Sequence, residues 1–145
     1  MATRIQPAQI QNLQQIEAVV AGPDGADCLF VVTAQFDGGV SAFSQGNNTG
    51  QQTQTFTVLV GPVLTRQQFV RAIGLASLAK TNFSLQTAPG NVNWQVVAVD
   101  ADWDDESGQV EVRIEVFVTV SGNNNSVNIN GLSFQVTILA AMGGQ

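Results

Sequence analysis

The side chains best able to carry chemistry gather in one short acidic segment that holds five of the eleven carboxylates. Asp100, Asp102 and Asp104 have the spacing of positions 1, 3 and 5 of a calcium-binding loop, and Glu111 falls at position 12. Asp105 stands where the sharp turn of such a loop needs glycine, and the flanking residues predict strands rather than helices. The pattern therefore favours a hairpin loop with a solvated acidic tip. We predict no metal site and no cofactor.

The side chains that most often support catalysis are missing. Histidine and tyrosine are absent, which removes the commonest general base and the phenolic acid. Cys28 is the single cysteine, so the chain forms neither an internal disulfide nor a thiolate zinc site, and its apolar neighbours predict a buried, inert thiol. The acids beside Trp103 suggest glycoside hydrolysis, but consecutive carboxylates on a turn do not oppose each other across a cleft. We therefore predict no catalytic residues and no enzymatic activity.

The two tryptophans form a sugar-stacking platform only if they share one face of a strand. Trp94 is in phase with Val96, whereas Trp103 is in phase with Val99. A regular strand over residues 92–103 would present them on opposite faces. We therefore predict that both tryptophans serve packing.

Charge and composition exclude two classes of partner. Only 11% of the residues are charged, and the net charge is −6. This balance disfavours binding to nucleic acid or to anionic membranes. No apolar run approaches a membrane span, and the first residues lack the apolar stretch of a secretory signal, so we expect synthesis in the cytoplasm. Gln, Asn, Thr and Ser make up about a third of the chain, which suits structural proteins that pack against copies of themselves.

The chain divides into an N-terminal arm, residues 1–25, and a single β-rich domain, residues 26–145. In the arm, Ile10, Leu13 and Ile16 have the three-residue spacing of a helical stripe, so we expect an extended or helical arm. Such a short, narrow stripe is not stable alone. We predict that Ile5, Ile10, Leu13 and Ile16 dock the arm on the domain or on a neighbouring subunit.

The domain contains several strand patterns and one helix pattern. Strands are predicted at residues 28–36, 40–43, 53–61, 92–103, 109–120 and 132–140, with a tight turn at Asn130-Gly131. A capping pair, Thr65 and Gln68, begins a stripe that predicts a packed helix at about residues 65–79. The expected fold is mainly β, either all-β or α+β. It is an antiparallel sandwich or bent sheet with that one helix packed on it.

The clearest core strand follows a strict period of two. Its buried face consists of Val110, Val112, Ile114, Val116, Val118 and Val120. Several other strands are apolar on both faces, and one small sandwich with one helix has too few layers to cover them all. The arrangement therefore predicts a homo-oligomer with exchanged arms.

Residues 4–16 read Arg-Ile-Gln-Pro-Ala-Gln-Ile-Gln-Asn-Leu-Gln-Gln-Ile. This run resembles the linker segments of tailed-phage fibre and virion accessory proteins, which carry an I-x-P-x-Q-I-x-N-L pattern. The resemblance implies a virion component, trimeric, whose N-terminus attaches it to other subunits. The small size suits a capsid cement, or decoration, protein better than a long fibre.

We therefore expect a non-enzymatic capsid cement protein, located in the virion, that stabilises the shell as a self-associating β-rich unit. Its partners would be itself, as a homotrimer, and the major capsid protein or another virion protein. The alternative is a small β-sandwich that binds glycans or another ligand, including receptor binding in a tail or fibre. Its binding end would combine the loops at residues 45–52, 100–106 and 121–126.

Overall fold

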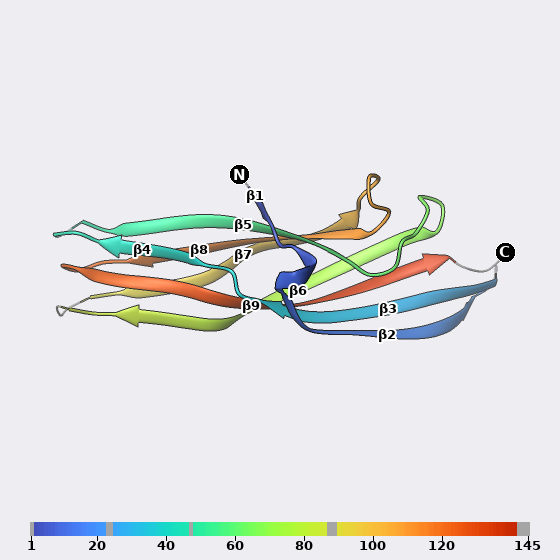
Figure 1. The fold of residues 1–145 in the computed structure, drawn as a ribbon, viewed down its shortest axis with the longest axis horizontal. Helices are drawn as coiled ribbons and strands as arrows, with labels where there is room; N and C mark the ends of the chain where they lie inside the picture. Colours follow the sequence, from blue (N-terminus) through green and yellow to red (C-terminus); the bar gives the residue numbers. More distant parts are fainter. Residues whose placement is uncertain (1, 23–24, 47, 87–89, 142–145) are drawn as a thin grey trace.

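The chain folds into two β-sheets (Figure 1). The central strands of the sheets are β8 (Val110–Val120) and β9 (Asn125–Ala141), in which buried and less buried residues alternate. The computed structural model describes residues 2–22, 25–46, 48–86 and 90–141. In these ranges the sheets form an elongated sandwich whose strands run along the long axis. The prediction of a mainly β fold is confirmed.

The sheet around β8, called the β8 sheet below, has the strand order β1-β5-β8-β7. β5 (Gly50–Val60) and β7 (Val92–Trp103) pair antiparallel with β8. β1 (Ala2–Arg4) pairs in parallel with β5. Residues 2–4 are therefore part of this sheet.

The second sheet, called the β9 sheet, is built around the 17 residues of β9. Its other strands are β2 (Ile10–Gly22), β3 (Gly25–Phe36), β4 (Val40–Ser44) and β6 (Phe69–Ser84). β3 and β4 pair with successive parts of β9 on one side, β6 pairs with it on the other, and β2 pairs with β3 at the edge. Because β9 runs without a break through Asn130 and Gly131, the tight turn predicted there is wrong.

The core fills the space between the sheets. The six residues of the predicted core strand, Val110 to Val120 on the even face, are fully buried. Leu132, Phe134, Val136, Ile138 and Ala140 of β9 belong to the same cluster. Phe36 packs between Phe56 and Phe134, with ring centroids 5.4 and 6.1 Å away. Burial of these apolar side chains is the main force that holds the sheets together.

The helix predicted at residues 65–79 is wrong. The capping pair does form, because the Thr65 N–H donates to Oε1 of Gln68 at 2.9 Å and the Gln68 N–H donates to Oγ1 of Thr65 at 3.3 Å. It closes one turn only, after which the chain enters β6 and pairs with β9. Small residues such as Gly74 and Ala76 alternate with exposed Ile73 and Leu75 there, which is the period of a strand.

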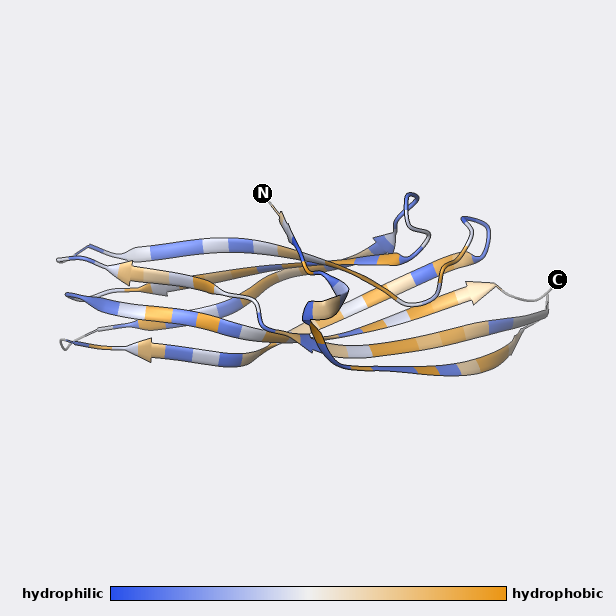
Figure 2. Cartoon of the chain, viewed as in Figure 1, coloured by the Kyte–Doolittle hydropathy of each residue, from blue (hydrophilic) through white to orange (hydrophobic). Residues whose placement is uncertain are grey.

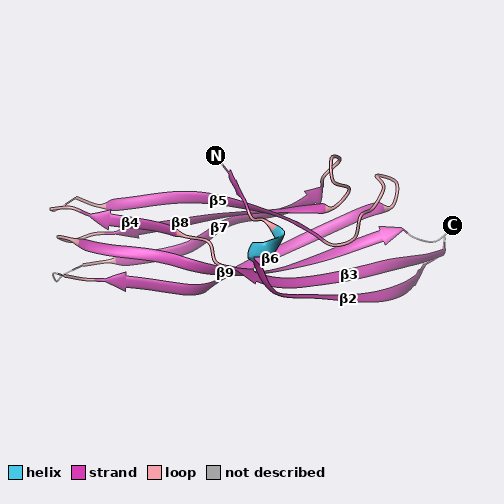
Figure 3. Cartoon of the chain, viewed as in Figure 1, coloured by secondary structure: helices cyan, strands magenta, loops and turns pink. Residues whose placement is uncertain are grey.

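The arm was predicted to be either extended or helical. The structure shows an extended arm, so the helical alternative is wrong. Apart from Ile5, Gln6 and one turn of 3-10 helix, η1 (Pro7–Gln9), the described part of the arm is strand (Figure 3). A bulge between Gln11 and Gln14 places two residues of β2 opposite one of β3, and Asn12 has a φ of 54° there. The bulge explains why Ile10 and Leu13 are three residues apart in a strand. No helix in the described residues is long and apolar enough to cross a membrane.

The two tryptophans lie on the same face of β7, contrary to the prediction. Trp94 pairs with Val118 and Trp103 pairs with Val110, both of which are buried on the inner face of β8. A bulge at Val97 inserts one extra residue and shifts the alternation. The tryptophans pack at opposite ends of the strand. Trp94 lies edge-on to Phe83, with ring centroids 5.7 Å apart.

Candidate functional site

The four residues predicted to dock the arm lie in two different settings. Ile5 is 4% exposed, and its N–H donates to the carbonyl of Thr57 at 2.8 Å. Ile10 is half-buried against the core. Leu13 and Ile16, by contrast, are 58% and 66% exposed. The first two residues thus pack on their own chain, and the last two are available to another molecule.

Ile16 belongs to a row of outward side chains that crosses the β9 sheet. It pairs with Val31 of β3, Val31 pairs with Thr137 of β9, and Thr137 pairs with Ile73 of β6. Residues directly opposite in an antiparallel ladder point to the same face. Ile73 is 57% exposed, and Leu75, two residues along β6, is 63% exposed. This part of the outward face of the sheet is therefore largely apolar and open to solvent.

The neighbouring row extends the apolar surface toward the end of the sheet. Ala18 pairs with Leu29, and Leu29 pairs with Leu139. The outer apolar face, as named here, consists of Ile16, Ala18, Val20, Leu29, Val31, Ile73, Leu75 and Leu139. In Figure 2 the half of the β9 sheet near the C-terminus is mostly coloured as hydrophobic, inward and outward residues alike. Contiguous apolar surface of this kind marks a site of contact with another molecule.

A shallow groove lies beside the outer apolar face on the same side of the sheet. Its polar lining includes Asn12, Gln14, Gln35, Ser77, Ser133 and Gln135. The Asn12 amide donates to Oε1 of Gln35 at 3.1 Å, and the hydroxyls of Ser77 and Ser133 are 2.9 Å apart. The lining contains no charged side chain. Neutral hydrogen-bonding groups therefore border the apolar surface.

The outer face of the β8 sheet carries charged side chains along β8 itself. Arg4 forms an ion pair with Glu111 at 2.8 Å. In the ladder, Glu111 pairs with Asp102, and Arg113 pairs with Asp100. This charged face stays well hydrated. The β9 sheet also carries charge beside its outer apolar face, because Arg71 pairs with Leu139 and Lys80 forms an ion pair with Asp37 at 3.2 Å.

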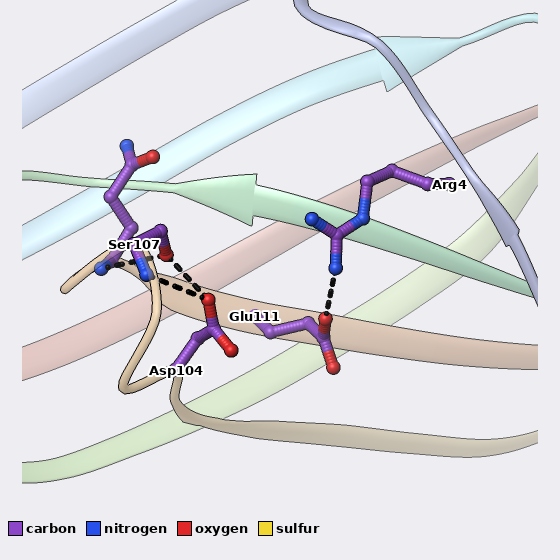
Figure 4. Close-up of polar contacts among 5 residues, drawn as sticks. Arg4, Asp104, Ser107 and Glu111 are labelled. Carbon is purple, nitrogen blue, oxygen red and sulfur yellow. Dashed lines mark hydrogen bonds and ion pairs between the residues drawn. The ribbon is translucent and has the colours of Figure 1, made fainter.

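The acidic segment forms the end of β7 and a hairpin loop. The Asp104 carboxylate accepts hydrogen bonds from the Ser107 hydroxyl at 2.7 Å and the Ser107 N–H at 3.0 Å (Figure 4). These two bonds, the hydroxyl first, hold the pKa of Asp104 below its ordinary value. Glu111 is engaged by Arg4. Within the described residues, no three Cys, Asp or Glu side chains gather closely enough to hold a metal ion.

The three loops expected to form one binding end lie at opposite ends of the sandwich. Gly50 pairs with Val120, so the loop before β5 and the loop after β8 share one end. Trp103 pairs with Val110, so the acidic loop lies at the other end. The 11 residues of β8 separate them by about 36 Å. The loops therefore do not form a single ligand site.

Sequence reasoning missed Ile73, Leu75, Leu29, Val31 and Leu139 as surface residues. Ile73 and Leu75 were missed because a helix was predicted for their segment. The alternation of Ala72, Gly74, Ala76 and Leu78 with larger or polar neighbours could have indicated a strand there. Leu29 and Val31 lie on a strand that is apolar on both faces, and the sequence does not say which face is covered. Leu139 lies on the mostly polar face of β9, with Ser133, Gln135 and Thr137.

Comparison with known proteins gives no relative. No protein-family model, curated protein or solved structure matches this chain.

Proposed function

We propose that the protein is a non-enzymatic structural component of a tailed-phage virion, of the capsid cement type. The proposal is carried by the outer apolar face, on which Ile16, Ile73 and Leu75 are each more than half exposed. Covering this face with another protein would remove apolar area from water, which favours association. The neutral groove beside it would let two protein surfaces meet without burying unpaired charge.

The virion role rests on the resemblance of residues 4–16 to phage linker segments. That run contributes two of the exposed apolar residues, Leu13 and Ile16. We propose that the outer apolar face docks on shell subunits or another virion protein, and that copies of the protein associate with one another. The predicted number of copies is three. A protein that binds only the assembled shell stabilises that shell by mass action.

A ligand-binding module is the second candidate, and the neutral groove favours it. Amide and hydroxyl groups such as those of Gln14, Gln35 and Gln135 match the hydrogen-bonding groups of a sugar. Both tryptophans, however, are turned toward the inner face of β7 and do not supply a stacking surface on this side. Binding of oligosaccharides by a monomeric protein would favour this candidate over the cement role.

The test is binding to emptied, expanded capsids of the phage that encodes the chain, measured by co-sedimentation. The double variant Ile73→Ser/Leu75→Ser removes two side chains that are 57% and 63% exposed. Full burial of one such side chain is worth about 1.5–3 kcal/mol, so the pair contributes about 2–3.5 kcal/mol per bound copy. We expect binding to weaken about 30- to 400-fold.

Val97→Ser is the matched control, because Val97 is 49% exposed but lies on β7 in the other sheet. It should bind capsids as the unmodified protein does. Absence of binding by the unmodified protein, or equal binding by the double variant, would contradict the cement role.

A further inference from the structure

β2 leaves one long edge of the β9 sheet open. From Gln14 to Gly22, β2 pairs with β3 residue by residue without a bulge, and no strand in the described residues pairs with its other side. Glu17 is the single charged residue in this stretch, which contains no Pro, Lys or Arg. An open edge exposes backbone N–H and C=O groups that can pair with another strand.

The other edges carry features that block the addition of a strand. β6 carries Arg71 and Lys80 and has three irregularities in its pairing with β9. β7 has the bulge at Val97 and carries Asp100 and Asp102. β1 and β4 are only three and five residues long. Charges, bulges and short strands are the usual protections of sheet edges, and the regular part of β2 has only Glu17.

We propose that β2 pairs antiparallel with β2 of a second copy, about a two-fold axis at Ala18. The inference deepens the proposed function, because it rests on the proposed self-association and names the contact. A two-fold pairing of this kind closes at two copies, so it replaces the predicted trimer with a dimer. In this register, Ala18 faces Ala18, Glu17 faces Val19, Ile16 faces Val20, Gln15 faces Ala21 and Gln14 faces Gly22. The pairing forms about eight to ten backbone hydrogen bonds.

Three observations select this register. It uses the whole unbulged stretch from Gln14 to Gly22. An axis at Glu17 would set two carboxylates directly opposite each other, which is destabilising. An axis at Ile16 would extend the pairing into the bulge between Gln11 and Gln14, where the ladder is disrupted.

The pair would also enlarge the docking surface. Ile16, Ala18 and Val20 lie on the outer apolar face, so joining two β2 edges joins two such faces into one. Ile16 of each copy would pack beside Val20 of the other, a β-branched pair that stabilises strand contacts. The exposed Val19 would likewise gain a neighbour on the opposite face of the sheet.

The first test measures native mass by light scattering. We expect a dimer of the 15.3 kDa chain. Ala18→Lys should raise the dimer dissociation constant at least about tenfold, because it sets two like charges opposite each other at the axis. Ala98→Lys is the control, since Ala98 is an exposed alanine on the β7 edge and receives the same substitution. It should leave the dimer intact.

The second test reads the register by disulfide formation in a Cys28→Ser background. Ala18→Cys should give a covalent dimer on mild oxidation, because directly opposite residues lie within disulfide reach. Ile16→Cys should not, because the two copies of residue 16 would be offset by about 13 Å along the strands. The double variant Ile16→Cys/Val20→Cys should cross-link again.

The outcomes separate this inference from the proposed function. A monomer, a trimer whose residue 18 does not cross-link, or a dimer unaffected by Ala18→Lys would each overturn the β2 pairing. Cross-linking of the single variant Ile16→Cys would overturn the register. If the protein binds capsids but gives one of these results, the β2 pairing is overturned and the cement role stays in place. If the protein forms the expected dimer but does not bind capsids, only the cement role is overturned.

Discussion

Deletion of Val97 should leave the fold intact, because Val97 is the extra residue of the β7 bulge. Trp94 and Val96 point inward and pair with Val118 and Val116, whereas Ala98 pairs with Glu115 on the outer face. Without Val97, inward Val96 would be followed directly by outward Ala98. The inward and outward positions would then alternate regularly as far as the end of β7.

The expected costs follow from burial. Val97 is 49% exposed, so its deletion forfeits at most about 1–1.5 kcal/mol of apolar burial. Deletion of Glu115 from β8, which has no bulge in its pairing with β5, is the contrast. It would turn Val116, Val118 and Val120 out of the core, each of which is fully buried. At about 1.5–3 kcal/mol per side chain, the loss is about 4.5–9 kcal/mol, which approaches the whole stability of a typical domain.

The assay is urea unfolding followed by tryptophan fluorescence, which reports on both ends of β7. The Val97 deletion should unfold cooperatively with a stability within about 1.5 kcal/mol of the unmodified protein and an unchanged emission maximum. The Glu115 deletion should yield little folded protein. If deletion of Val97 were as damaging as deletion of Glu115, or shifted the emission to the red, the assignment of Val97 as the extra residue would be refuted.

Two further predictions concern a close backbone contact and a titrating carboxyl. Gly50→Ala should cost about 1–3 kcal/mol in thermal unfolding, because a Cβ there would collide with the backbone carbonyl of Phe43, whereas Gly39→Ala, with nothing within 4 Å, should be near neutral. Equal melting temperatures for the two variants would contradict the contact. Ser107→Ala should raise the pKa of Asp104 in an NMR titration, and an unchanged pKa would exclude the hydroxyl hydrogen bond, which the variant lacks, as a cause of the lowering. Because the folded pKa is lowered, the stabilisation from Ser107 should be present above about pH 4 and disappear as the pH falls through the folded value.

Alternation along a single strand was sufficient to predict the core. In β8, six apolar residues at every second position alternate with five residues that are polar apart from Phe117, and a strand is the conformation that separates the two sets. β7 coincides with its predicted range, residues 92–103. Where the two faces differ in polarity, local sequence therefore determines both the strand and its buried side.

Bulges and pairing account for the errors. The bulge near Asn12 adds one residue to β2, and the apolar residues of the arm therefore had the spacing of a helix. The bulge at Val97 adds one residue to β7, and Trp103 therefore lies on the face opposite to the predicted one. In β6 the capping pair at Thr65 was a correct local signal, but pairing with β9 determined the conformation of the residues that follow. Helix propensity is a weak predictor of the conformation of a segment that can pair with a long neighbouring strand.

The outer apolar face was not predictable as a surface, although the sequence indicated that some apolar faces would stay uncovered. It combines residues from β2, β3, β6 and β9, which are brought together only by the order of strands in the sheet. Ile16 was identified from its place in the arm. Ile73 needed the pairing of β6 with β9 before its outward direction was known.

The path of β9 has a mechanical consequence. Over its length it pairs with β3 and β4 on one side and with β6 on the other, so it connects the two ends of the β9 sheet. Hydrogen bonds of an antiparallel ladder run perpendicular to the strands. A pull along the long axis would therefore load many of them in shear at once, instead of opening them one after another. A chain built in this way is suited to resist stretching along its long axis.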